Sequence, residues 1–182
     1  MLSKYFKLIA SKKKFSIPKK KKFLIIDKIF LSEFKKKFGK DLNFLDVRLK
    51  EINVYILLGL IFSGKKLNFF NYLKRYIKVV QPKIVITGND NLTYFYKFKR
   101  FFPNIKFISI QNGFRNKVFF KTLNSSDSLR SDYIFVFSKI WANYYKSKIK
   151  TKIISLGSFY NNQVKNLKKK KRKSILFVSS GY

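Results

Sequence analysis

The sequence lacks cysteine and histidine, and only eight of its 182 residues are acidic. The absence of cysteine excludes disulfides, thiol catalysis and cysteine metal sites. The absence of histidine removes the commonest general base and the commonest metal ligand. Any acid–base chemistry therefore falls to Asp or Glu, and we expect neither a metal site nor a cofactor.

Long apolar runs are also missing. The longest covers nine residues, 54–62, whereas a helix needs about 20 to span a bilayer. We predict a buried helix over Ile52–Phe62. The apolar amino-terminal residues are interrupted by Lys4 and Lys7, and no small-residue cleavage site follows, so a signal peptide is not indicated. The expected location is the cytoplasm, and peripheral contact with the inner membrane is compatible with the sequence.

What the sequence does contain is positive charge. Lys and Arg together number 42, which gives a formal net charge of +34. The 42 divide into 36 Lys and 6 Arg, and only two Ala occur in the chain. This composition is typical of an A+T-rich genome, which uses codons for Lys, Phe, Ile and Asn. Specific nucleic-acid binders favour Arg, which supplies bidentate contacts to bases and phosphates. Because Arg is scarce in this chain, we expect no specific nucleic-acid partner. Non-specific attraction to anionic membranes or RNA still follows from the charge.

Short apolar, β-branched runs bounded by turn residues recur along the chain and predict strands. Their spacing alternates with helical patterns, which is typical of a parallel sheet. We therefore predict an α/β fold, a Rossmann-like parallel sheet with helices on both faces. The predicted strands are Phe23–Ile26, Phe44–Arg48, Lys83–Thr87, Ile105–Ile110, Asp132–Phe137 and Lys152–Leu156. All but Phe44–Arg48 are expected as neighbours in that sheet.

The segments between these strands predict the helices. Apolar residues recur at helical spacing from Leu67 to Val80, and Pro82 stops that helix. Further helices are expected over Leu31–Phe38, over the aromatic stretch that ends before Pro103, and over Lys139–Ser147, whereas residues 114–131 look irregular. In domain terms, residues 1–22 form a basic amino-terminal segment, 23–165 the main domain, 166–173 a basic linker, and 174–182 a further apolar strand with a small-residue turn.

Polar turns follow two strands that we expect to be neighbours. Asn89 and Asp90 follow one strand, and Gln111, Asn112 and Gly113 follow the next. Ligands of open α/β sheets bind at the carboxyl ends of the strands, so these residues are candidates for substrate binding. Asp90 is a weak candidate for a general base. The alternative for Asp90 is an Asx turn or a helix cap, where Asp is favoured anyway.

Other polar residues are placed near the same edge. Arg115 is a candidate partner for phosphate or carboxylate, with a solvated surface charge as the alternative. Gly157 and Ser158 end the last predicted strand of the main domain, and they are candidates for contact with a donor substrate. Asp27 ends the first strand, where a capping role is favoured over contact with an acceptor.

Six segments carry a family resemblance: VRLKEINVYILL, QPKIVITGNDN, FISIQNGFR, DYIFVFSKIWANYY, ISLGSFYNN and KRKSILFVSSGY. In this order they resemble bacterial surface-carbohydrate biosynthesis proteins of lipopolysaccharide and capsule loci, and these are similar to glycosyltransferases built from two Rossmann domains (GT-B). The resemblance covers residues 23–182. Related transferases often carry Gln-His-Gly in the second turn, where this chain has Asn112.

The resemblance implies the acceptor-side domain of a glycosyltransferase, with residues 174–182 as the first strand of a truncated second domain. It implies a nucleotide-sugar donor and a glycan or lipid-linked acceptor in the intact enzyme, and a chain that does not transfer sugar alone. The alternative is a basic module that binds RNA or an anionic membrane without catalysis. Lysines clustered on one face among exposed aromatics favour this alternative, and scattered lysines do not.

Overall fold

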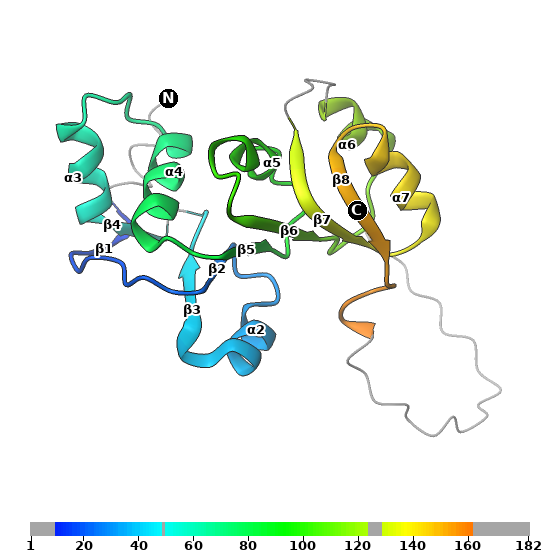
Figure 1. Cartoon of the computed structure of the whole chain (residues 1–182), viewed down its shortest axis with the longest axis horizontal. Helices are drawn as coiled ribbons and strands as arrows, with labels where there is room; N and C mark the ends of the chain where they lie inside the picture. The colour runs from blue at the N-terminus through cyan, green and yellow to red at the C-terminus, as the bar shows by residue number, and fades with distance from the viewer. Residues whose placement is uncertain (1–9, 49, 124–128, 162–182) are drawn as a thin grey trace.

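The computed structural model describes residues 10–48, 50–123 and 129–161. Its centre is a parallel sheet of six strands in the order β3-β2-β5-β6-β7-β8 (Figure 1). Every neighbouring pair in this sheet is parallel. The six strands are β2 (Phe23–Ile26), β3 (Leu42–Leu45), β5 (Ile84–Thr87), β6 (Lys106–Ile110), β7 (Arg130–Val136) and β8 (Lys150–Ser155).

Helices lie on both faces of this sheet. Figure 1 shows α2 below the sheet, α4 and α5 above it, and α6 and α7 beside β7 and β8. Tyr145 of α7 belongs to the same core cluster as side chains of α4 and α5. The α-helices are α2 (Leu31–Phe38), α3 (Val54–Phe62), α4 (Phe69–Val80), α5 (Phe95–Phe98), α6 (Lys117–Thr122) and α7 (Lys139–Lys146), with 3₁₀ turns η1 (Gly39–Asp41) and η2 (Lys99–Phe101). The predicted fold class is confirmed.

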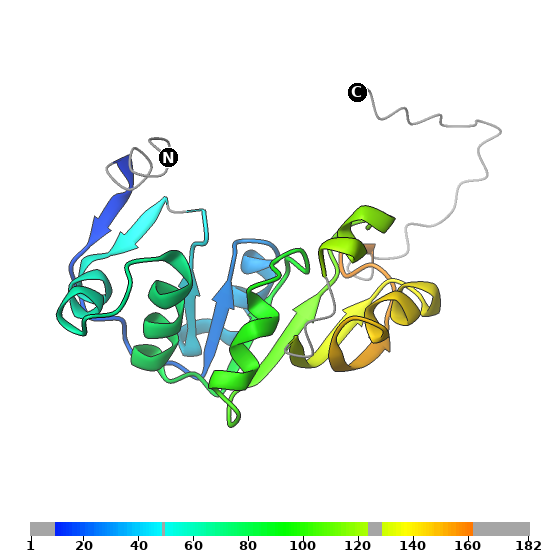
Figure 2. The same ribbon diagram turned by 90° about the horizontal axis from the view of Figure 1, so that it is seen from above.

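The chain changes direction across the sheet at β2. It first passes through α2 to β3 on one side, then returns through α3 and α4 to β5 on the other side. Because the two connections cover opposite faces, β2 and β5 flank the topological switch point of the sheet. Figure 2, the view from above, shows the strands side by side and running in one direction.

The sheet is buried on both faces, but to different extents. Residues that alternate along a strand point to opposite faces. Leu24 and Ile26 thus join a large cluster with α3, α4, α5 and α7, whereas Ile25 joins a smaller cluster with Phe30 and Phe34 around α2. This two-sided burial explains why the strands read as continuous apolar runs in the sequence.

Five predicted strands lie next to one another as expected. Phe23–Ile26 has the predicted bounds, and the other four differ by one or two residues at their ends. The strand predicted at Phe44–Arg48 instead runs from Leu42 to Leu45 at the edge of the sheet, because the chain turns at Asp46, whose side chain accepts a hydrogen bond from the Arg48 amide.

A second, two-stranded sheet was not predicted. In it β1 (Lys12–Lys14) pairs in parallel with β4 (Glu51–Asn53). The first lies in the basic amino-terminal segment, for which no strand was predicted, and the second overlaps the start of the helix predicted from Ile52. The helix begins only at Val54 because the Asn53 side chain caps it, accepting a hydrogen bond from the Ile56 amide at 3.1 Å.

Two further expectations were wrong. The helix predicted as buried, α3, is buried only at Ile56 and Leu60, whereas the opposite face is exposed. The stretch expected to be irregular contains α6, which begins after Asn116; the side chain of Asn116 accepts a hydrogen bond from the Phe119 amide at 2.9 Å. Within residues 10–48, 50–123 and 129–161, no helix has the length and apolar character needed to cross a bilayer.

The predicted linker and the predicted strand beyond it, residues 166–173 and 174–182, lie outside the described residues. Both stay predictions.

Candidate functional site

The turns after β5 and β6 meet at the carboxyl edge of the sheet. Thr87 and Ser109 are register partners, so Gly88–Asn91 and Gln111–Arg115 leave neighbouring strands at the same level. Asp90 and Arg115 are in direct contact across the two turns. Asp90, Asn112 and Arg115, three of the residues predicted for this edge, are therefore joined by hydrogen bonds, whereas the Gln111 side chain bonds to Phe137 and Gly113.

The Asp90 carboxylate lies at the centre of a buried network. One oxygen, Oδ2, accepts from Arg115 Nε at 2.7 Å and from the Tyr145 hydroxyl. The other, Oδ1, accepts from the Asn112 amide at 3.2 Å and from Arg115 Nη2. A carboxylate offers about four acceptor positions, and here four donors occupy them. The geometry therefore favours a role for Asp90 in holding the two turns, rather than in taking a proton from a substrate.

The electrostatics of the network agree with this role. Burial by itself would lower the pKa of Arg115. The hydrogen bonds and the negative charge of Asp90 have the larger combined effect, so the pKa of Arg115 is raised. Burial, followed by the charge of Asp90, raises the pKa of Tyr145. Arg115 thus stays charged and the Tyr145 phenol stays neutral near neutral pH, so Tyr145 is a hydrogen-bond donor to Asp90.

Gln111 also holds the framework. Its Oε1 accepts from the Phe137 amide at 2.9 Å, and its Nε2 donates to the Gly113 carbonyl at 3.0 Å. The side chain therefore fixes the end of β7 and closes its own turn. Asp90, Gln111 and Arg115 are 0%, 1% and 8% exposed, so none of the three presents its side chain at the surface.

The surface of this edge is formed by other predicted residues. Asn89, Asn112 and Gly113 are half-buried, and Phe114 beside them is exposed and packs edge-on against Trp141 at 4.8 Å between ring centroids. Side-chain amides both donate and accept, which suits polyhydroxylated ligands. Asn112 is also held in place, because its Oδ1 accepts from Arg115 Nη2.

A second polar cluster lies at the switch point between β2 and β5, centred on Asp27. The Asp27 backbone is left-handed, with φ of 71°. Its Oδ2 accepts from Asn89 Nδ2 at 2.9 Å, and its Oδ1 accepts from the Lys28 amide. Arg48, half-exposed, brings its Nε to 3.8 Å from Oδ1. Strained polar residues cluster at functional sites, and ligands bind at switch points, so this cluster belongs to the candidate site.

Gly88 allows the two turns of this cluster to approach each other. A Cβ at Gly88 would lie 2.5 Å from the ring of Phe30 and 2.7 Å from the Ile29 carbonyl oxygen. Any larger residue would therefore push the turn after β2 away from the turn after β5. Tyr94 lines the same region, where burial and then the charge of Asp27 raise its pKa.

The segment after β8 returns toward the switch point. Gly157 has φ of 78°, a left-handed conformation that favours glycine, and the chain turns there. The rings of Phe159 and Tyr160 then pack against Phe30, at 4.5 and 4.6 Å between centroids. Ser158 is half-buried beside them. Gly157 and Ser158, the candidates for contact with a donor substrate, therefore lie in the chain segment that borders Phe30, and their contact with a donor stays a prediction.

Sequence reasoning missed Arg48 and Tyr145 and undervalued Asp27. Asp27 could have been ranked higher from sequence, because it is a polar residue directly after the first strand. The strand order shows in addition that this strand flanks the switch point. Tyr145 lies 55 positions from Asp90 on a helix, and nothing in its own spacing marks it. Among the described residues, no group of three or more acidic side chains is arranged to hold a metal ion.

Comparison with known proteins gives a match to a family over part of the chain. Residues 108–182 match the model of a family described as "putative O-antigen biosynthesis protein". This stretch begins within β6 and includes the Gln111–Arg115 turn, Tyr145 and the Gly157–Ser158 turn. No curated protein and no solved structure matches the chain. The match links the carboxyl-terminal part of the chain to surface-carbohydrate biosynthesis, in agreement with the resemblance seen in the sequence.

Proposed function

We propose that this chain is the acceptor-side domain of a GT-B-type glycosyltransferase that acts in O-antigen biosynthesis. The observation that carries the proposal is the family match over residues 108–182, because the matched stretch contains the Gln111–Arg115 turn, which brings half-buried Asn112 and exposed Phe114 to the carboxyl edge of the sheet. The proposed partners are a nucleotide-sugar donor and a glycan or lipid-linked acceptor. The proposed location is the cytoplasm, where the nucleotide-sugar donor would be available.

The site chemistry supports recognition of a sugar more than transfer by this domain alone. Asn89 and Asn112 present amides beside exposed Phe114, and Arg48 adds a positive charge near Asp27. Such groups hydrogen-bond hydroxyls and pair with phosphate or carboxylate. Asp90 and Arg115 are assigned a positioning role, since their buried pair orients Asn112.

The alternative, a module that binds RNA through its charge, receives less support. Exposed lysines occur on several separate elements, including β1, α2, α4 and α7, rather than on a single groove. Sequence-independent binding of single strands needs a positively charged groove combined with stacking aromatics. The scatter of the lysines agrees with the explanation from codon usage.

A genetic experiment tests the proposed function. The gene is deleted in its host, and the extracted surface polysaccharide is separated by size on a gel. We expect the long polysaccharide bands to disappear and wild-type protein to restore them. Asn112→Ala should restore them poorly, whereas Asn104→Ala, an exposed Asn at the amino edge of β6, should restore them fully. An unchanged band pattern after deletion would contradict the proposal.

A further inference from the structure

The outward face of α3 is apolar, which is unusual for a helix at a protein surface. Ile56 and Leu60 face the core, one turn apart, while Tyr55, Leu58, Ile61 and Phe62 are exposed. We call these four side chains the α3 patch. Phe62 is 84% exposed. A helix that is apolar all round is normally buried in a core or in a membrane, yet this one has protein on one side only.

Further apolar side chains lie close to the α3 patch. Asn53 Nδ2, at the start of α3, donates to the Ser16 carbonyl at 2.8 Å, so exposed Phe15 and Ile17 lie beside that end of the helix. Exposed Leu67 follows the other end. Of the 13 large apolar side chains exposed in the described part of the chain, seven belong to this corner of the molecule. Such a gathering indicates an interaction surface rather than scattered exposure.

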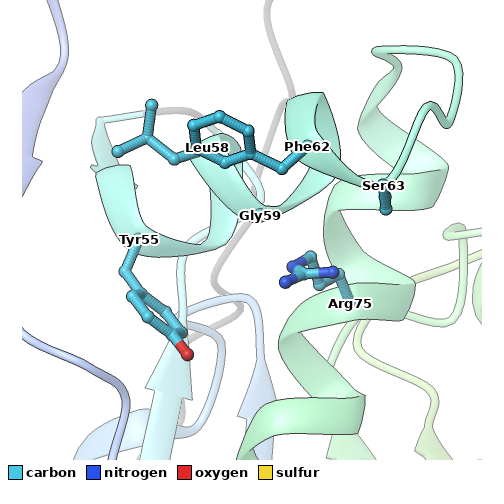
Figure 3. Close-up of a pocket in the computed structure, with 6 residues that line it drawn as sticks. All are labelled: Tyr55, Leu58, Gly59, Phe62, Ser63 and Arg75. Carbon is cyan, nitrogen blue, oxygen red and sulfur yellow. The ribbon is translucent and has the colours of Figure 1, made fainter.

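A cation lies directly beneath the α3 patch. Figure 3 shows the Arg75 guanidinium beneath α3, in a hollow lined by Tyr55, Leu58, Gly59, Phe62 and Ser63. It lies flat against Gly59, where a Cβ would be 2.0 Å from Nη2. Arg75 Nε is buried without a hydrogen-bond partner in the described residues. The guanidinium as a whole adds a positive charge beneath the α3 patch, and its planar geometry suits phosphate groups.

The surroundings of the α3 patch are positive. Residues 10–26 and 52–89 contain no Asp or Glu. Glu51, the nearest acid in sequence, is paired with Lys14. Partial burial and then the charges of Lys65, Lys78 and Arg100 lower the pKa of Lys74, so these three cations lie near Lys74. An apolar patch in a positive field is complementary to an anionic bilayer surface, which offers both charge and hydrocarbon.

We propose that α3 docks this protein on an anionic lipid bilayer, with the α3 patch inserted at the boundary between headgroups and acyl chains. The helix has nine residues, or roughly 14 Å at 1.5 Å each, so it lies in the plane of the surface. Arg75 and the neighbouring lysines face the headgroup phosphates. This inference is independent of the transferase activity proposed above.

An anionic bilayer fits these observations better than the other candidate partners. RNA binding would favour Arg and aromatic side chains, whereas half of the α3 patch is aliphatic, Leu58 and Ile61. A second copy of the chain would bring two charges of +34 together.

The test uses the full chain and sedimentation with vesicles of phosphatidylcholine containing phosphatidylglycerol. Phe62→Ser should weaken vesicle binding about tenfold or more, because the variant lacks the phenyl ring whose transfer from water into the bilayer favours binding. Its matched control is Ile140→Ser, since Ile140 is 68% exposed on α7. Lys65→Glu with Lys66→Glu should weaken binding more than Lys35→Glu with Lys36→Glu on α2, although both pairs change the net charge equally.

A fluorescence measurement separates insertion from attraction by net charge. In a Trp141→Phe background, Phe62→Trp should shift its emission to the blue with anionic vesicles, and Ile140→Trp should not. Equal binding by Phe62→Ser and Ile140→Ser would overturn the proposal. It would also be overturned if Phe62→Ser converted a dimer to a monomer, or abolished RNA binding, while leaving vesicle binding unchanged.

Discussion

Arg115 Nε donates a 2.7 Å hydrogen bond to the Asp90 carboxylate, and this buried pair ties the turn after β6 to the turn after β5. Both residues were candidates for substrate contact from sequence. Their burial and their hydrogen bonds to Asn112 favour a framework role, in which they orient Asn112.

Asp90→Asn should destabilise the protein strongly. Removing one partner of a buried ion pair leaves the other charge buried and unpaired, which costs about 3–5 kcal/mol. Glu51→Gln is the control, because its pair with Lys14 is partly exposed and such surface pairs contribute about 0–1 kcal/mol. Urea unfolding of the two variants measures the difference. A similar loss in both would show that Asp90 and Arg115 do not form the framework proposed here.

Tyr145→Phe should lower the free energy of unfolding by about 1–3 kcal/mol near neutral pH, since Asp90 loses a hydrogen-bond donor. Tyr144→Phe, on the same helix but exposed, should have little effect. Urea unfolding near pH 7 measures both. An equal effect of the two substitutions would remove Tyr145 from the network.

The difference between wild type and Tyr145→Phe should shrink above pH 10. Burial raises the pKa of Tyr145 in the folded protein, whereas the unfolded residue ionises near pH 10. The stability that Tyr145 contributes is therefore complete below pH 10 and is lost as pH rises, by about 1.4 kcal/mol per pH unit. Unfolding curves at pH 8 and pH 11 check this. A constant difference between the two proteins would indicate that Tyr145 ionises normally when folded.

Gly88→Ala should lower the stability of the protein more than Gly59→Ala does, although each new methyl group crowds a neighbour. At Gly88 the new methyl meets the Ile29 carbonyl at 2.7 Å, a backbone atom that cannot move alone, and overpacking of this kind costs about 1–3 kcal/mol. At Gly59 it meets only the flexible end of Arg75, and Ala is favoured within a helix. Thermal unfolding should show a lower Tm for Gly88→Ala alone. The reverse order would contradict the described packing of the two turns.

Much of the fold could be predicted because the strands are buried on both faces and read as β-branched runs between turns. The meeting of the Asp90 and Arg115 turns followed from the same reasoning, since neighbouring parallel strands end at one edge. The strand Lys12–Lys14 could not be predicted, because three lysines show no apolar alternation and their partner lies near residue 52.

The direction in which each side chain points at the carboxyl edge of the sheet also could not be predicted from the sequence. A position after a strand does not show whether Asp90 points outward to a ligand or inward to Tyr145, because that depends on a helix 55 residues away. Likewise, nine apolar residues in α3 indicated burial, while the extent of the surrounding protein decides how much of the helix is covered.

The central claim is that the carboxyl edge of the sheet binds a glycan. The most direct test is a titration of the ¹⁵N-labelled full chain with oligosaccharides of the host's O-antigen repeat, followed by amide chemical shifts. The account predicts shifts at Gly88–Asn91, Gln111–Arg115 and Gly157–Ser158, with Asn104 at the opposite edge unchanged. Shifts confined to the amino edge, or no shifts at saturating oligosaccharide, would contradict it.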